Sequence, residues 1–444
     1  MRRTILAATC AVTALALTAT GCTSSGDAAA GGATCDGKID GKRTITAFYH
    51  AGGEEKKAFM GIVKEFNESQ DKVTVKVQSV PEGTYNDSVQ AAAAADKLPD
   101  ILDFDGPLLY NYAWNRNIIP LDRCLKASTK KDLLPSIVQQ GTYDKKLYGV
   151  GAFDSGLVLY AYKSALKQVG ARIPKGVEDA WTPQEFAEIL GKLQKKGYKR
   201  PLDLHMWYGR QGEWLSYAFS TIVQSAGGDL IDRKDYTSAK GVLDKPEVVK
   251  ALKQFQSWFS QGYVDTEAQD DSPFLKKRSP IAWNGMWAYT QGYEKAAGKD
   301  LAVIPLPDFG TGSKTGMGSW QFGITSKAED PDAAAAFLEH LLTKQGVLKM
   351  HKATGAPPSR KSALADAGIY ADGGPMELVT KSLEKAPKVS VPRPQTPAYP
   401  AITQAFAQAI DDISQGKDVK QALDTAVAAI DQDIRDNDGY PPVE

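Results

Sequence analysis

Three short stretches of the chain combine aromatic rings with hydrogen-bonding side chains and glycines. A sugar presents apolar C–H faces and a rim of hydroxyl groups, so its binding site needs flat rings for stacking and polar groups at their edge. A core helix would not carry so many polar groups between its rings. The stretches are MWYGRQGEW at 206–214, AWNGMWAY at 282–289 and GMGSWQF at 316–322.

We expect ligand contacts from seven side chains of these stretches, with packing in the core as the alternative for each ring. Three other tryptophans lie in different patterns. Trp258 belongs to a helical apolar pattern, Trp181 precedes a helix start and Trp114 lies on a helix, so we expect none of them at the site. The expected ligand-binding residues are Trp207, Glu213, Trp214, Trp283, Asn284, Trp287 and Trp320.

Signals for catalysis are weak in comparison. A glycosidase needs two carboxyl groups roughly 5 to 10 Å apart across the scissile bond, and adjacent acids such as Asp103 and Asp105 do not by themselves define a common pocket. The chain contains no Gly-x-Ser-x-Gly motif. In the stretch 310–315, Lys314 does not follow the glycine directly as a phosphate loop requires. The sequence favours a binding protein over an enzyme.

The sequence also gives little indication of a metal site or a cofactor-binding motif. The four histidines, at positions 50, 205, 340 and 351, are scattered without the close His or Cys spacing of a metal site. The acidic run at 431–439 lacks the residue order of a calcium-binding loop. We therefore expect neither a metal nor a cofactor.

The amino terminus has the pattern of an export signal. Arg2 and Arg3 precede an apolar stretch that is too short and too rich in threonine to span a bilayer. Small residues then lead to Cys22, and this junction resembles the lipobox of bacterial lipoproteins, although Ala19 stands where leucine or valine is commoner. We expect a signal peptide at 1–21, a lipid on Cys22 and a flexible linker at 22–43. Ordinary secretion with an incidental cysteine is the alternative.

An exported protein anchored to the outer face of the cell membrane meets neither nucleotides nor nucleic acid. Loss of 1–21 removes two arginines and no acid, which leaves 51 basic against 53 acidic residues. Such a balanced charge argues against polyanionic partners. Cys35 and Cys124 then remain as an even pair in an oxidising compartment, which favours a disulfide over two free thiols.

Strand and helix patterns alternate at the start of the mature chain. Strand-like runs at 45–50, 73–80 and 101–104 enclose a helix with Phe59, Ile62, Val63 and Phe66 on one face and an alanine-rich helix at 85–95. This alternation predicts a parallel α/β sheet covered by helices. Thr182, Pro183 and Glu185 mark a capped helix start. Further helices are expected at 213–225, 246–261, 330–343, 397–415 and 418–435.

An ordered set of short segments resembles the family 1 extracellular solute-binding proteins, the carbohydrate receptors of ABC importers. The similarity covers nearly the whole mature chain, although no single segment is specific. It implies an α/β, two-lobed periplasmic-binding-protein-like fold of type II, whose discontinuous lobes are joined by a hinge and close on a ligand. The segments are TAFYHAGG at 46–53, PDI at 99–101, IPLD at 119–122, WTP at 181–183, GGD at 227–229, WNGMW at 283–287, GSW at 318–320 and GAP at 355–357.

The resemblance also implies lobe boundaries and further contacts. We expect 44–153 with 301–355 in the N-terminal lobe, and 154–300 with 356–444 in the C-terminal lobe. His50, Glu54 and Asp105 follow strand ends, where ligands bind in open α/β sheets, and the same loops lie at the cleft in the family. Ser155 lies at the first crossing between lobes. Arg393, on a stiff proline-rich segment, is expected either to bind ligand or to form a salt bridge.

The expected function is therefore extracytoplasmic capture of a small carbohydrate and its delivery to the permease subunits of an ABC transporter, with contact to the membrane only through the lipid. An exported carbohydrate-active enzyme and a receptor of the same fold for a non-sugar solute are the alternatives. A polyamine site would need several convergent acids, and the three aromatic stretches offer mainly Glu213. This favours a neutral sugar.

Overall fold

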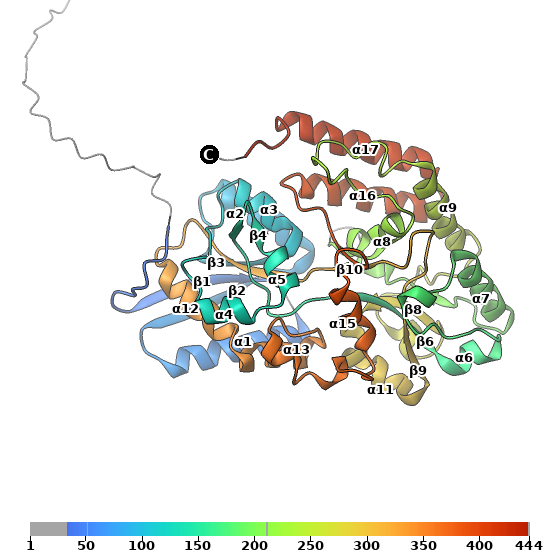
Figure 1. Ribbon diagram of the computed structural model, residues 1–444, viewed down its shortest axis with the longest axis horizontal. Helices are drawn as coiled ribbons and strands as arrows, with labels where there is room; N and C mark the ends of the chain where they lie inside the picture. Colours follow the sequence, from blue (N-terminus) through green and yellow to red (C-terminus); the bar gives the residue numbers. More distant parts are fainter. Residues whose placement is uncertain (1–32, 51, 210–211, 443–444) are drawn as a thin grey trace, which may run out of the picture. The chain divides into compact units, whose positions relative to one another are not determined.

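The computed structural model describes residues 33–50, 52–209 and 212–442 (Figure 1). The expected signal peptide and the lipidation candidate Cys22 lie outside the described residues. No helix among the described residues is both long and apolar enough to cross a membrane.

The first lobe contains a four-stranded sheet in the order β11-β3-β1-β2. Strand β1 pairs in parallel with β2 and with β3, as the alternation of strands and helices predicts. The sheet is not wholly parallel, however, because β11 enters from much later in the chain and pairs antiparallel to β3. The strands are β1 (Arg43–Tyr49), β2 (Val73–Ser79), β3 (Ile101–Asp105) and β11 (Trp320–Ile324).

Helices cover this sheet as the apolar periodicity predicts. Helix α1 buries Phe59, Ile62, Val63 and Phe66, and the ring of Phe66 meets Phe337 of α12 with centroids 5.4 Å apart. The long helices of this lobe are α1 (Gly53–Ser69), α2 (Tyr85–Ala94), α12 (Pro331–Leu341) and α13 (Lys344–Thr354). Its shorter elements are α3 (Leu109–Trp114), α4 (Ala127–Asp132), α5 (Pro135–Gln140), α14 (Lys361–Leu364) and the hairpin β4 (Thr142–Tyr143) with β5 (Lys146–Leu147).

The second lobe is built on a sheet in the order β7-β8-β6-β9. Strand β6 runs antiparallel to β8 and β9, whereas β7 and β8 are parallel. Every residue of β6 and β8 is buried, because helices and loops cover both faces of the sheet. The strands are β6 (Leu157–Tyr162), β7 (Leu202–Asp203), β8 (Ile281–Gly285) and β9 (Leu301–Ile304).

The helices of this lobe confirm the expected positions. The Thr182 hydroxyl accepts a hydrogen bond of 3.2 Å from the Glu185 amide and so caps α7. Helix α8 is buried along its whole length. The long helices are α7 (Pro183–Lys195), α8 (Trp214–Ser225), α9 (Pro246–Ser260), α16 (Tyr399–Ser414) and α17 (Val419–Asp436). The shorter ones are α6 (Lys163–Gln168), α10 (Ser272–Leu275), α11 (Glu294–Ala297) and α15 (Glu377–Glu384).

Two of the expected lobe boundaries need correction. The boundary at 301 assigns β9 to the first lobe, but β9 pairs with β6 in the second sheet, with Leu301 opposite Tyr162. The boundary at 356 is too early, because Arg360 still pairs with Asp132 of α4 at 2.7 Å. Between the lobes, β10 (Thr315–Met317) and β12 (Ser390–Pro392) form a separate parallel pair. The lobe of β9 was predicted wrongly because a short apolar run in the sequence does not indicate which of the two sheets the strand joins.

The segment before β1 is anchored rather than free. Cys35 and Cys124 form a disulfide across 89 residues of chain. The backbone amides of Asp36 and Gly37 donate to the carboxylate of Asp332, at 2.9 and 3.0 Å. The expected flexible linker at 22–43 is therefore wrong for its described part, since covalent and hydrogen-bonded contacts hold that part to the first lobe.

Replacement of Cys35 and Cys124 by serine should lower the free energy of unfolding by about 2–4 kcal/mol, because the open chain gains entropy when a loop of this length is released. Urea unfolding of the mature protein with and without reductant measures the difference. Reductant should destabilise the native protein and leave the C35S/C124S variant unchanged. Equal stability of the two proteins without reductant would contradict the prediction.

Candidate ligand-binding site

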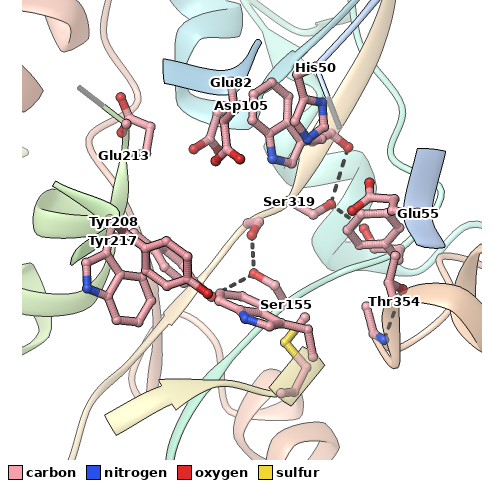
Figure 2. Close-up of a pocket in the computed structure, with 18 of the residues that line it drawn as sticks. His50, Glu55, Glu82, Asp105, Ser155, Tyr208, Glu213, Tyr217, Ser319 and Thr354 are labelled. Carbon is pink, nitrogen blue, oxygen red and sulfur yellow. Dashed lines mark hydrogen bonds between the residues drawn. The ribbon is translucent and has the colours of Figure 1, made fainter. Parts of the chain in front are cut away.

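A cavity of about 350 Å³ is lined by residues of both lobes and of the segments that connect them (Figure 2). The first lobe contributes mainly carboxylates and the paired rings of His50 and Trp320, and the second lobe contributes mainly aromatic rings. The side chains that line the cavity include His50, Glu55, Glu82, Asp105, Phe153, Ser155, Tyr208, Glu213, Trp214, Tyr217, Met286, Trp287, Gln291, Ser319, Trp320, Thr354 and Arg393.

His50 and Trp320 form one wall of the cavity. Trp320 begins β11, and its ring stacks on the imidazole of His50 with planes 5° apart. The imidazole Nδ1 lies 2.5 Å from the carboxylate of Asp103, and the His50 backbone amide donates to the same carboxylate at 3.2 Å. Burial opposes protonation of the imidazole, but the charge and hydrogen bond of Asp103 outweigh it, so the pKa of His50 is raised. The His50–Asp103 pair therefore holds the indole plane.

The opposite wall consists of aromatic rings from the loops and helix of the second lobe. Trp287 lies edge-on to Trp214, with centroids 6.2 Å apart, and nearly parallel to Tyr217 at 6.3 Å. The indole N–H of Trp214 donates to the Leu204 carbonyl at 3.0 Å, which fixes that ring. A Cβ at Gly285 would lie 2.1 Å from the ring of Trp287. The glycine at the end of β8 is therefore needed for the indole to fold back over the strand.

Arg393 connects the two lobes beneath these walls. Its guanidinium donates to both oxygens of Asp105 in the first lobe, at 2.8 and 2.5 Å, and to Glu213 at the start of α8, at 2.8 Å. The Arg393 side chain is buried. Burial raises the pKa of Glu213 although Arg393 opposes the shift. The salt-bridge alternative expected for Arg393 is therefore present in the structure, and its Nε has no partner among the described residues.

Ser155 occupies the first crossing between the lobes, as expected. Its hydroxyl lies 2.7 Å from the Tyr217 hydroxyl and donates to the Gly318 carbonyl. Gly318 has a φ of 112°, a conformation that favours glycine, and it precedes Ser319 and Trp320. The Ser155 contacts thus tie the crossing segment to α8 and to the turn that presents Trp320.

Four expected ligand contacts lie outside the cavity lining. Trp283 packs in the core, with its ring 6.1 Å from Phe219, and the buried Asn284 donates to His205 Nε2 at 2.9 Å. Both lie on β8, whose two faces are covered, so the side chains on either face of this strand are buried in packed layers. Glu54 is exposed and pairs with Lys57 at 2.6 Å. Trp207 does not line the cavity but packs on Tyr208, with centroids 4.2 Å apart.

Several lining residues were not among the expected ligand contacts, although the sequence carries signals for some of them. Glu55 is adjacent to Glu54 in the first turn of α1, and one helical step turns it toward the cavity. Glu82 follows β2, so the carboxyl-end rule applied to β1 and β3 could have found it. Tyr217 is one turn beyond Trp214 on α8, on the same face. For Met286, Gln291 and Thr354 no comparable signal existed.

Among the residues that the structure describes, no group of three or more His, Cys, Asp or Glu side chains is arranged to hold a metal ion. The arrangement offers flat rings on two sides, carboxylates on one side, and hydroxyl groups of Ser155, Ser319 and Thr354 between them. Such a cavity is suited to a small polar ligand with apolar faces.

Solved structures share this architecture. The chain matches a cyclic alpha-maltosyl-1,6-maltose binding protein from Arthrobacter globiformis with a TM-score of 0.69 and 24% identity, covering 89% of this chain and 100% of that one. It also matches the GacH receptor of Streptomyces glaucescens GLA.O, solved unliganded and with acarbose, with a TM-score of 0.74 and 19% identity over 89% and 100% of the two chains. The fold is that of the two-lobed, maltose-binding-type proteins.

Sequence comparison identifies the family. The model for bacterial extracellular solute-binding proteins matches residues 61–376, and the chain belongs to this family. Among curated relatives, the maltodextrin-binding protein MdxE of Bacillus subtilis (strain 168) is 23% identical over 407 residues, covering 89% of this chain and 91% of MdxE. The multiple sugar-binding protein of Streptococcus mutans serotype c (strain ATCC 700610 / UA159) is 20% identical over 337 residues, covering 72% and 75%.

The His50–Asp103 pair should make stability depend on pH. A raised folded-state pKa means that the stabilisation is fully present below the ordinary histidine value of 6.5 and is lost as the pH rises through the higher pKa. Urea unfolding between about pH 5.5 and 8.5 should show the native protein losing stability over this interval relative to a His50→Gln variant. Parallel pH profiles of the two proteins would contradict the prediction.

Proposed function

We propose that the protein captures a carbohydrate between its lobes outside the cell and delivers it to the permease of an ABC importer. The observation that supports this most strongly is the pairing of aromatic rings from both lobes across one cavity, with hydroxyl and carboxylate groups between them. Relatives whose names specify maltodextrin and multiple sugars, at 23% and 20% identity, support the same class of ligand.

In this proposal, the ligand stabilises the closed arrangement because only that arrangement lets both walls contact it. A shift from 1:99 to 99:1 in favour of closure needs about 5.5 kcal/mol of differential binding. Stacking on a ring supplies on the order of 1 kcal/mol, and each hydrogen bond to an uncharged group supplies about as much. Trp287, Trp320 and Tyr208 with a few hydrogen bonds would be sufficient.

A thermal-shift screen against mono- and oligosaccharides tests the proposal directly. A ligand present at 100 times its dissociation constant adds about 2.7 kcal/mol to the stability of the folded state. Incubation of the purified protein with the sugars that bind, followed by chromatography of the products, distinguishes a receptor from a carbohydrate-active enzyme. A receptor yields stoichiometric binding without turnover, and product formation would favour the enzyme.

Replacement of Trp287 and Trp320 by alanine should weaken binding of such a sugar at least about tenfold, because one stacking surface is lost on each wall. Isothermal titration calorimetry measures the affinity. Trp114→Ala is the matched control, since its indole packs on Tyr440 and donates to the Pro441 carbonyl away from the cavity. Native affinity in a folded W287A/W320A variant would contradict these roles.

We also propose that a lipid on Cys22 anchors the protein to the outer face of the cell membrane. The junction at 19–22 supports this, because it combines small residues with a cysteine directly after an apolar stretch. In cells that express the full chain, Cys22→Ser should move the protein from the membrane fraction to the medium or the periplasm. Cys10→Ser, within the same signal, is the control. Retention of the C22S variant in washed membranes would contradict the anchor.

A further inference from the structure

Carboxylates outnumber cations around the cavity. Four carboxylates line it, and Asp103 lies directly behind His50. Arg393 pairs with two of the lining carboxylates, Asp105 and Glu213, and His50 pairs with Asp103. With all five carboxylates ionised and His50 protonated, these two cations leave three negative charges uncompensated on the described part of the wall, and two of the five carboxylates have no ion-pair partner there.

Among the described residues of the wall, the two carboxylates without an ion-pair partner are Glu55 and Glu82. Glu55 accepts a hydrogen bond of 3.2 Å from the Tyr49 hydroxyl, and within the described residues neither glutamate forms an ion pair with a lysine or arginine. Figure 2 shows both glutamates and Asp105 on the His50 side of the cavity, with Tyr208 and Tyr217 opposite. Burial raises the pKa of the half-buried Glu55, although the charge of His50 opposes the shift, which means that negative charge is costly there. The pKa of Glu82 is raised for the same reason and against the same charge, but its side chain is exposed, so water still solvates that carboxylate before a ligand binds.

Local backbone structure stabilises the negative charge of only one of these two glutamates. Glu55 lies in the first turn of the 17-residue helix α1, where the amino end of a helix favours an anion. Glu82 lies in a single 3₁₀ turn (Glu82–Thr84), which is too short to offer the same support. An excess of negative charge toward the cavity is therefore not required by the fold.

A second, independent feature indicates what the ligand must offer. The Arg393 side chain is 3% exposed and lines the cavity, and its Nε has no acceptor among the described residues. A buried donor without a partner is costly, so a ligand oxygen that reached it would be favoured. Trp320 provides a flat aromatic surface on the same wall as Glu55 and Glu82, and such a surface attracts a cation.

We propose that the ligand is an amino sugar that carries a protonated amine, which the carboxylates of Glu55 and Glu82 receive beside Trp320, while its hydroxyl groups contact Arg393 and the serine and threonine hydroxyls. This inference rests on the proposed function and narrows its ligand class. Closure over a neutral sugar would remove water from two carboxylates without supplying a positive charge, whereas an ammonium group compensates for that loss. The expectation of a neutral sugar considered only the acids within the three aromatic stretches. Glu55 and Glu82 lie outside those stretches.

Calorimetry with matched oligosaccharides tests the inference. The probes are β-1,4-linked glucosamine dimers and trimers, their N-acetylated forms and the corresponding glucose oligomers, so that only the first set is charged. We expect the amino oligosaccharides to bind at least about tenfold more tightly than either neutral set. Equal or tighter binding of a neutral set would overturn the inference and leave the proposed function standing. Absence of binding by every amino and neutral sugar in the screen would contradict both.

Substitution of the two glutamates tests whether they bind the ammonium group of the ligand. Glu55→Gln with Glu82→Gln keeps the size and hydrogen-bonding capacity of both side chains and should remove the preference for the amino oligosaccharides. Glu54→Gln is the matched control, because Glu54 is adjacent in sequence but pairs with Lys57 outside the cavity. Urea unfolding establishes that each variant is folded. An unchanged preference in a folded E55Q/E82Q variant would overturn the assignment of these residues.

Discussion

The guanidinium of Arg393 holds the ligand cavity together, because it bonds in the same small volume to Asp105 of the first lobe and to Glu213 of the second. Removal of charges from water is expensive, and only close, hydrogen-bonded geometry compensates for it. Tyr399 and Thr403 donate further hydrogen bonds to Glu213 from α16. The segment from Arg393 into α16 thereby determines how the strand end of β3 and the start of α8 face each other.

This constraint brings the aromatic rings of the two lobes to opposite walls of one cavity. On one wall, His50 and Asp103 orient Trp320. On the other wall, Trp214 and Tyr217 on α8 support Trp287. Because Ser155 binds both Tyr217 and the turn before Trp320, the connecting segment contacts both walls. A movement of one lobe relative to the other would therefore be transmitted directly to the distance between the stacking surfaces.

Hydrophobic periodicity predicted the secondary structure well, and the reason is local. Burial of Phe59, Ile62, Val63 and Phe66 on one face of α1 requires only that a helix should meet an apolar layer, whatever that layer is. Thr182 caps α7 through a contact three residues away. The expected lobe boundaries placed β9 in the wrong lobe, and the antiparallel pairing of β11 with β3 was not predicted. Both pairings join segments that are more than 100 residues apart in the chain.

The same distinction applies to the site: some of its features follow from neighbouring residues in the sequence, and others depend on the tertiary structure. By itself, the sequence determined that aromatic and polar side chains occur together in three stretches and that loops at strand ends carry acids, since both are properties of neighbouring residues. Only the tertiary structure decided that Trp287 and Trp320 face the cavity while Trp283 is in the core. It also decided that Glu55 rather than Glu54 lines the wall. Which face of a strand or helix meets solvent depends on layers contributed by distant segments, and a linear pattern does not contain their positions.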